Sequence, residues 1–142
     1  MIRALIDTNV VLDAYLQRGE FAFWALEIIQ KIEEERFEGC ISASTITDLY
    51  FIVRKNTQKT DVALKVIESA YALLTILPVD KRIIRLALDS AINDFEDAVQ
   101  AFVAKAMNVD IVVTRDKTGF ADSGMTVFTP QEFLTYLELP SE

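Results

Sequence analysis

The segment DIVVTRD at residues 110–116 contains the clearest buried strand in the chain. Its core, Ile111, Val112 and Val113, is β-branched and flanked by turn-forming residues, which predicts a short strand covered on both faces. A second apolar run, RALI at residues 3–6, has the same character and also leads to an aspartate. The two runs therefore indicate buried strands of an α/β fold.

Outward from these runs, helical and strand-like patterns alternate along the chain. Helices are predicted at 21–36, 45–55, 60–74, after Asp80, from Asn93 or Asp94, and at 131–137, and further strands near 40–41, 75–79 and 125–128. Gly39 is interpreted as the stop signal of the first long helix. Strands that alternate with helices imply a parallel sheet covered on both faces, so we predict an α/β protein with five short strands.

Length and composition bound the organisation of the chain. We expect one domain over residues 1–142, with disorder only in the last few residues, because half of the residues are hydrophobic and only four are glycine. The first apolar run is too short for a signal peptide, and none approaches the ~20 residues of a membrane span. We therefore expect a soluble, cytoplasmic protein that makes no use of a membrane.

The residue types that are missing restrict the chemistry. There is no histidine, which excludes the commonest general base and every histidine metal site. Cys40 is the only cysteine, which excludes an internal disulfide and a zinc site built from cysteines. The net charge of −8 by itself argues against a nucleic-acid partner, unless part of the negative charge belongs to a metal site.

Five aspartates fall where a parallel sheet binds its ligands. Asp7 follows the first strand, Asp116 follows the fourth, and Asp48 lies early in the helix after the second. Asp94 and Asp97 lie in the first turn of the helix before the fourth strand, and their spacing of three puts both on one face. Ligands of open α/β sheets bind beyond the carboxyl ends of the strands, so we expect these carboxylates to converge.

Such a cluster predicts a bound cation. Two like charges at ~4 Å repel by about 1 kcal/mol in water and about 4 kcal/mol at an effective dielectric of 20. Oxygen ligands suit Mg²⁺ or Mn²⁺, and the ion can activate water and hold a phosphate oxygen in place of the missing histidine. Thr8 and Asn9 can orient Asp7 or a water on the ion, and Thr114 can do the same at the other strand end.

Each of these residues also has a purely structural interpretation. Acids at helix starts, such as Asp48, Asp94 and Glu96, commonly cap the helix or remain solvated. Asp7 can close a turn with the residues that follow it, Asp116 can be a turn residue, and strand propensity alone explains a threonine at 114. The helical spacing of the aromatic residues Phe21, Phe23, Trp24, Phe95 and Phe102 assigns them to the core rather than to base stacking.

Four motifs in this order resemble those of the PIN-domain family, which includes the toxin ribonucleases of prokaryotic toxin–antitoxin pairs. They are LIDTNV at 5–10, STITDL at 44–49, DFEDAVQ at 94–100 and IVVTRDK at 111–117, followed by Gly119 and Phe120. The resemblance implies a three-layer α/β/α sandwich with a short, mainly parallel five-stranded sheet. It further implies a Mg²⁺- or Mn²⁺-dependent endoribonuclease that is the toxin of such a pair, with RNA as substrate and an antitoxin as partner. Because the negative net charge predicts a weak grip on RNA by one subunit, we also expect a homodimer.

The resemblance also assigns roles to residues. Asp7, Asp48, Asp97 and Asp116 correspond to the family's catalytic acids, and Asp7, Asp97, Asp116 and the added neighbour Asp94 to its metal ligands. Asp48 stands where the family often has glutamate, and Gly119 where relatives often have a further aspartate. The last motif adds Arg115 to the residues that contact or orient the substrate, beside Thr8, Asn9 and Thr114.

Two other functions fit the sequence. An Asp-based phosphatase or phosphotransferase would use Asp7 as its nucleophile, but such sites usually have a second acid two residues later, where this chain has Asn9. A non-catalytic PIN-like binding module would use the acids only to hold a partner. Phosphate release from a small phosphoester would favour the first, and metal binding without cleavage would favour the second.

Overall fold

The computed structural model describes residues 1–140, so the predicted disorder of the last few residues concerns a segment that lies partly outside the described residues. Within them, five strands form one sheet in the order β3-β2-β1-β4-β5. They are β1 (Arg3–Ile6), β2 (Glu38–Ser42), β3 (Thr75–Leu77), β4 (Ile111–Val113) and β5 (Thr126–Phe128). All four neighbouring pairs are parallel, as predicted.

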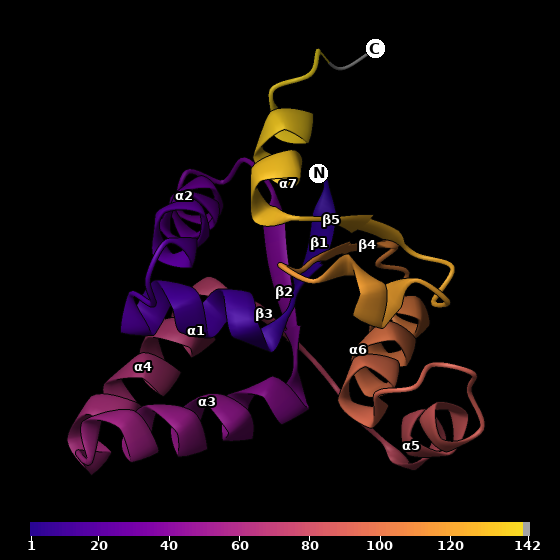
Figure 1. Cartoon of the computed structure of the whole chain (residues 1–142), viewed down its shortest axis with the longest axis horizontal. Helices are drawn as coiled ribbons and strands as arrows, with labels where there is room; N and C mark the ends of the chain where they lie inside the picture. Colours follow the sequence, from indigo (N-terminus) through magenta and orange to yellow (C-terminus); the bar gives the residue numbers. More distant parts are fainter. Residues whose placement is uncertain (141–142) are drawn as a thin grey trace.

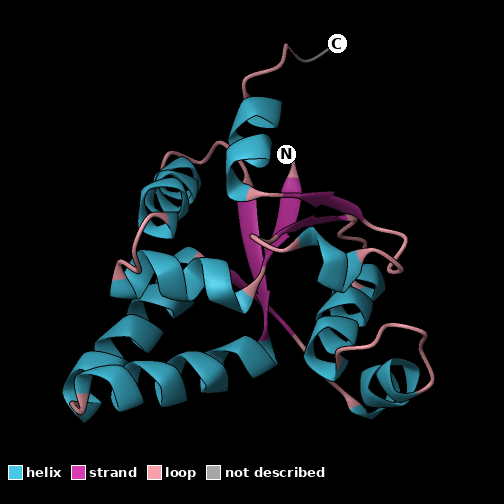
Figure 2. Ribbon diagram, viewed as in Figure 1, coloured by secondary structure: helices cyan, strands magenta, loops and turns pink. Residues whose placement is uncertain are grey.

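Helices cover both faces of this sheet, which confirms the three-layer α/β/α sandwich (Figures 1 and 2). The helices are α1 (Thr8–Leu16), α2 (Phe21–Glu33), α3 (Ala43–Thr57), α4 (Thr60–Leu73), α5 (Lys81–Leu88), α6 (Phe95–Ala106) and α7 (Pro130–Leu137), with a short 3-10 helix η1 (Lys117–Phe120). In Figure 1, α1 to α4 lie on one side of the strands and α5 and α6 on the other. None of the helices within residues 1–140 combines the length and the apolar character needed to cross a membrane.

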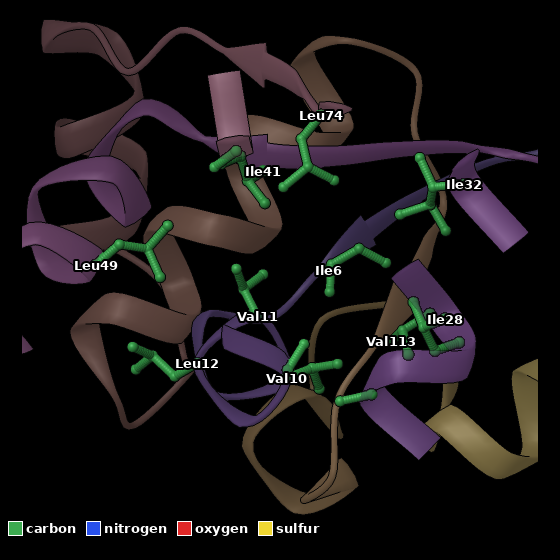
Figure 3. Close-up of a cluster of buried hydrophobic side chains, with 14 of the residues drawn as sticks. Ile6, Val10, Val11, Leu12, Ile28, Ile32, Ile41, Leu49, Leu74 and Val113 are labelled. Carbon is green, nitrogen blue, oxygen red and sulfur yellow. The ribbon is translucent and has the colours of Figure 1, made fainter. Parts of the chain in front are cut away.

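Each face of the sheet has its own hydrophobic core. Ile6, Ile41 and Val113 point to the side of α1 to α4, where the side chains drawn in Figure 3 pack together. Their sequence neighbours Leu5 and Val112 point to the opposite side and pack against α6. Because successive strand residues face opposite layers and both layers are apolar, the strands are continuous hydrophobic runs rather than alternating ones.

The strand order places a crevice at the carboxyl ends of β1 and β4. From β1 the chain moves through β2 to β3 on one side, and β4 and β5 then add on the other side. The segments that leave β1 and β4 therefore diverge and open a crevice between them. Parallel sheets bind ligands in such a crevice. Asp7 directly follows β1, and residues 114–116 follow β4.

Gly39 was predicted to end the first long helix, and that prediction is wrong. The helix α2 already ends at Glu33, and Glu35 turns the chain with a positive φ of 59°. Gly39 lies in β2, where an added Cβ would stand 2.5 Å from Ile32 Cδ1. The Ile32 side chain of α2 fills the space that a Cβ at position 39 would take, so a larger residue there would require this side chain to shift. The glycine therefore allows α2 to pack closely on the strand and does not end the helix.

Candidate active site

A cavity of about 280 Å³ lies at the crevice between β1 and β4. All five aspartates singled out in the sequence line it, and so does Glu96. Its lining residues are Asp7, Thr8, Asn9, Leu12, Asp48, Ile52, Asp94, Glu96, Asp97, Gln100, Thr114, Asp116 and Gly119. Within residues 1–140 no lysine or arginine lines this cavity, so its negative charge has no cationic partner in the wall.

Asp7 is fixed at the base of the cavity by neutral groups. Its backbone N–H donates to Val113 O at 2.9 Å, which ties the end of β1 to β4. The residue as a whole is only 7% exposed. Oδ1 accepts a hydrogen bond from Gln100 Nε2 at 3.0 Å, and Oδ2 accepts one from the Thr114 hydroxyl at 2.9 Å. The orientation of this carboxylate is therefore set by an amide and a hydroxyl, neither of which cancels its charge.

Gln100 is a site residue that the sequence interpretation did not single out. It lies one helical turn after Asp97 on α6 and is 4% exposed. Because an ionised carboxylate can only accept hydrogen bonds, Asp7 requires the amide N–H₂ of Gln100, and the amide oxygen is left buried without a partner in the described residues. The available signal was a polar side chain within an otherwise apolar helix face.

The first turn of α6 gathers three acids. Asp94 caps the helix by accepting the backbone N–H of Asp97 at 3.0 Å, so its capping role and its place in the cavity coexist. Burial and the negative charges of Asp94 and Asp7 raise the pKa of Asp97 to about 7. Burial and the charge of Asp48 likewise raise the pKa of Glu96, and burial raises that of Asp48. These shifts mark the cavity as a place where negative charge is unfavourable without a cation.

Asp116 lies at the exposed rim of the cavity. It accepts hydrogen bonds from the backbone N–H and the hydroxyl of Thr118, at 3.1 and 2.6 Å, which hold the pKa of Asp116 below its usual value. It thereby caps η1, so the turn interpretation also holds. A Cβ on Gly119 would overlap Asp97 Oδ2, which means that the Asp97 carboxylate occupies the space of a side chain at 119.

Of the four predicted orienting residues, Thr114 contacts one of the predicted acids, and the hydroxyl of Thr8 and the amide of Asn9 have other partners. Thr114 donates to Asp7, as described above. The Thr8 hydroxyl instead bonds to the Thr45 hydroxyl at 2.9 Å, which links the starts of α1 and α3. Asn9 lines the cavity, but its Oδ1 accepts from Arg18 Nη2 at 3.2 Å.

Arg115 is not brought to the acid cavity. Its Nη1 donates to Asp13 Oδ1 at 3.2 Å, and its guanidinium lies 4.4 Å from the centre of the Phe21 ring. Thr114 and Asp116 face the acids, whereas the residue between them lines a neighbouring cavity. The buried carboxylate of Asp13, a residue not singled out in the sequence, holds the guanidinium on that side.

The residues of the acid cavity fit a hard divalent cation. Within residues 1–140 no three acidic or cysteine side chains stand as a ready-made set of ligands, so an ion would have to draw the carboxylates together. The donors are nevertheless oxygen atoms only, which is the preference of Mg²⁺ and Mn²⁺. The raised pKa of Asp97 and the unpartnered oxygen of Gln100 show that the chain alone does not satisfy this site.

Comparison with known proteins gives the family. The PIN-domain family model matches residues 3–118, so the chain belongs to the PIN-domain family, as its motifs predicted. It is 26% identical over 136 residues to Ribonuclease VapC1 of Aquifex aeolicus (strain VF5), covering 92% of each chain.

Solved structures share the fold. The DNA-bound VapBC from Salmonella typhimurium matches with a TM-score of 0.68 and 18% identity, covering 92% of this chain and 99% of that one. A toxin-antitoxin complex from Klebsiella pneumoniae matches with a TM-score of 0.63 and 22% identity, covering 89% and 97%. At these identities the two structures support the sandwich architecture described above.

Proposed function

We propose that this PIN domain is a metal-dependent endoribonuclease that hydrolyses RNA phosphodiester bonds. The observation that carries the proposal is the cavity itself, in which six carboxylates meet at the sheet crevice with no basic side chain among the described lining residues. The similarity to a ribonuclease over nearly the whole chain supports the same reaction. Carboxylates alone repel a phosphodiester, so the cavity can act on RNA only together with a cation.

The proposed ligands of Mg²⁺ or Mn²⁺ are Asp7, Asp94, Asp97 and Asp116. A divalent ion held there would supply a Lewis acid for the phosphoryl oxygen and would lower the pKa of water. The protein's part is to hold these carboxylates in place, and Asp7 has both oxygens fixed for that purpose.

Asp48 completes the proposed catalytic set from the opposite wall, on α3. Burial raises the pKa of its carboxyl, which makes it a better proton acceptor than an ordinary aspartate. We assign it the proton released by the attacking water. When water attacks the phosphorus and the bond to the ribose 3′ oxygen breaks, the phosphate stays on the 5′ end of one product. The 3′ oxygen leaves and takes up a proton, which gives a 3′-hydroxyl on the other product.

The proposed biological role is that of a toxin held by an antitoxin. One of the similar structures is a toxin-antitoxin complex, which supports a protein partner for this chain. A homodimer is also proposed, because a chain of net charge −8 has little general attraction for RNA and a second subunit can contribute contacts.

The test is cleavage of a labelled single-stranded RNA with Mg²⁺ or Mn²⁺, with analysis of the product ends. We expect 5′-phosphate and 3′-hydroxyl ends, and no cleavage in excess EDTA. Asp89→Asn is the matched control for substitutions of the acids, since Asp89 forms an exposed pair with Arg85 on α5. Cyclic 2′,3′-phosphate ends or cleavage in EDTA would refute the mechanism. Phosphate release from a small phosphoester would favour a phosphatase, and metal binding without cleavage a non-catalytic module.

A further inference from the structure

We propose that the second cavity, which Arg115 and Asp13 line, holds the nucleotide of the RNA strand next to the bond that is cut. This arginine cavity has a volume of about 310 Å³ and is lined by Phe21 and Trp24 as well. The inference rests on the proposed ribonuclease function and adds to it a place where the substrate is gripped.

The arginine cavity adjoins the acid cavity along two segments of the chain. After β4, Thr114 and Asp116 line the acid cavity, and Arg115 between them lines the arginine cavity. On α1, Leu12 lines the first and Asp13 the second. Residues adjacent in sequence line the two cavities, so these two segments of the chain form the wall between them. In the proposed complex, the RNA strand crosses this wall, with one phosphate at the acids and the neighbouring nucleotide in the arginine cavity.

Arg115 is prepared to bind an anion. One edge of its guanidinium is held by Asp13 and one face by the Phe21 ring. Of its five N–H donors, one has a hydrogen-bond partner in the described part of the chain, and the side chain is 29% exposed. A planar guanidinium that is already fixed loses little freedom when it binds a phosphate through two N–H groups.

The charge around the arginine cavity is also suitable. Asp13, whose side chain is 2% exposed, pairs with two guanidiniums, that of Arg18 at 2.8 Å and that of Arg115 at 3.2 Å. One buried carboxylate thus faces two guanidiniums, of which that of Arg115 belongs to the described lining of the cavity and that of Arg18 does not. Glu20 lines the cavity too, but it is exposed, where water and salt screen its charge.

The aromatic side chains supply the surface for a base. They were predicted to belong to the core, and for Phe21, Phe23 and Phe95 that prediction is wrong, because these side chains are 42%, 61% and 46% exposed. Trp24 is half-buried, packs edge-on against Phe23 and lines the arginine cavity. Bases of single-stranded RNA stack on aromatic rings and on guanidinium planes, so both elements of a base-binding surface are present.

The experiment combines a shortened substrate with substitutions in the cavity. The probe is a single-stranded RNA of about 12 nucleotides with one cut site, shortened one nucleotide at a time from either end. Wild type, Arg115→Ala, Arg115→Lys and Phe21→Leu are compared by kcat and KM, with Arg85→Ala as the control. In the wild type, loss of the nucleotide that occupies the cavity should raise KM about tenfold and leave kcat nearly unchanged.

The Arg115→Ala enzyme should already have the raised KM with the full RNA and should not respond to the shortening. Arg115→Lys, which keeps the charge without the planar fork, should show part of the effect, and so should Phe21→Leu. The melting temperature of each variant shows whether it is folded. If Arg115→Ala is not folded, the KM values of Arg115→Lys and Phe21→Leu test the proposal.

Three results separate the possible failures. If the wild type cleaves RNA but KM in the three variants is unchanged, the arginine cavity is not a substrate site and the proposed function stands. If the wild type cleaves no RNA, the proposed function fails and the inference fails with it. If Arg115→Ala lowers the molar mass in light scattering and leaves KM unchanged, the cavity lies in an interface between copies of the chain, and its assignment to RNA is wrong.

Discussion

Asp7 and Asp13 are the same chemical group six positions apart on one segment of the chain, and both are almost fully buried, at 7% and 1% exposure. Their surroundings differ in one respect. The Asp13 carboxylate accepts hydrogen bonds from two arginines, whereas the Asp7 carboxylate accepts one from an amide and one from a hydroxyl. Within residues 1–140, cations compensate the buried charge of Asp13 but not that of Asp7.

This difference separates a structural acid from a functional one. A buried carboxylate is costly unless opposite charge and hydrogen bonds compensate it. At Asp13 both are present, so the residue anchors α1 to the segment after β4. At Asp7 only hydrogen bonds are present, and Asp94 and Asp97 add negative charge nearby. The acid cavity thus lacks the cation that the arginine cavity contains, which is the property we expect of a metal site.

The largest effect should come from removing the uncompensated charges. Asp7→Asn keeps the size of the side chain but loses a proposed metal ligand, and we expect kcat/KM for RNA to fall roughly 10²–10³-fold. The kcat/KM of Asp97→Asn should fall by a similar factor. The kcat/KM of the double variant should be little lower than that of either single variant, because both ligands serve the same ion. Circular dichroism should show a folded protein in each case. The control Asp89→Asn should retain wild-type activity. If its kcat/KM fell by a comparable factor, the losses in Asp7→Asn and Asp97→Asn could not be assigned to the acid cavity.

Metal binding should stabilise the protein by the next largest amount. Mn²⁺ at 100 times its dissociation constant should raise the free energy of unfolding by about 2.7 kcal/mol, measured by urea denaturation with and without the ion. Asp7→Asn should lose most of this gain, and Asp13→Asn should keep it. Equal losses in the two variants would mean that the two carboxylates do not differ in the way proposed.

Gln100 should matter through Asp7 rather than through packing. Gln100→Leu preserves the bulk of the side chain but frees Asp7 Oδ1, and we expect the Mn²⁺ concentration for half-maximal activity to rise about 10- to 100-fold. Gln100→Glu should also weaken folding without metal, because it buries a second carboxylate beside Asp7. The matched control is Gln30→Leu on the exposed face of α2. Unchanged metal dependence in Gln100→Leu would leave the residue with a packing role only.

Asp13→Asn should act on stability instead of on metal binding. The variant leaves two guanidiniums without their anion, and we expect the free energy of unfolding to fall by about 1–3 kcal/mol in EDTA. Asp7→Asn in EDTA should show no such loss, because it removes repulsion rather than a pair. Urea denaturation of the two variants in the same buffer makes the comparison direct. A loss for Asp7→Asn as large as that for Asp13→Asn would contradict it.

The convergence of the acids could be predicted because it follows from backbone rules. Parallel strands end at a common edge, so residues that follow β1 and β4 must meet there, whatever side chains they carry. The direction of the Arg115 side chain could not be predicted from these backbone rules. It depends on the hydrogen bond to Asp13, a residue more than a hundred positions away in the sequence. Asp13 and Gln100 were nevertheless visible as polar residues within apolar helix faces, and that pattern deserved a functional or pairing hypothesis.

Other errors arose where local pattern does not determine packing. Helical spacing placed Phe21 and Phe23 on apolar positions of α2, but spacing does not fix how much of the helix surface the neighbouring elements cover. Gly39 was assigned to a helix end because glycine commonly has that role, whereas its role here is a close approach between α2 and β2. Both errors concern distances between elements, which a single sequence does not encode locally.

The smallest expected effect is the dependence of stability on pH without metal. The pKa of Asp97 rises from 3.8 in the unfolded chain to about 7 in the folded protein, so between these values the folded state binds more protons. Stability from this group is therefore fully present below pH 3.8 and is lost as the pH rises through about 7. Asp48 and Glu96 shift in the same direction, so they add to the trend.

In EDTA the melting temperature should therefore fall between about pH 5 and pH 8, and Asp97→Asn should make that fall shallower without removing it. The change should be modest, because Asp97 is only half-buried and solvent screens its neighbours. Saturating Mn²⁺ should reverse the trend, since the ion binds the ionised carboxylates and gains affinity as they lose their protons. Asp13→Asn should leave the slope unchanged, because Asp13 lines the arginine cavity and not the acid cavity. If the melting temperatures of wild type and Asp97→Asn changed in parallel with pH, Asp97 would not be the group whose protonation causes the trend.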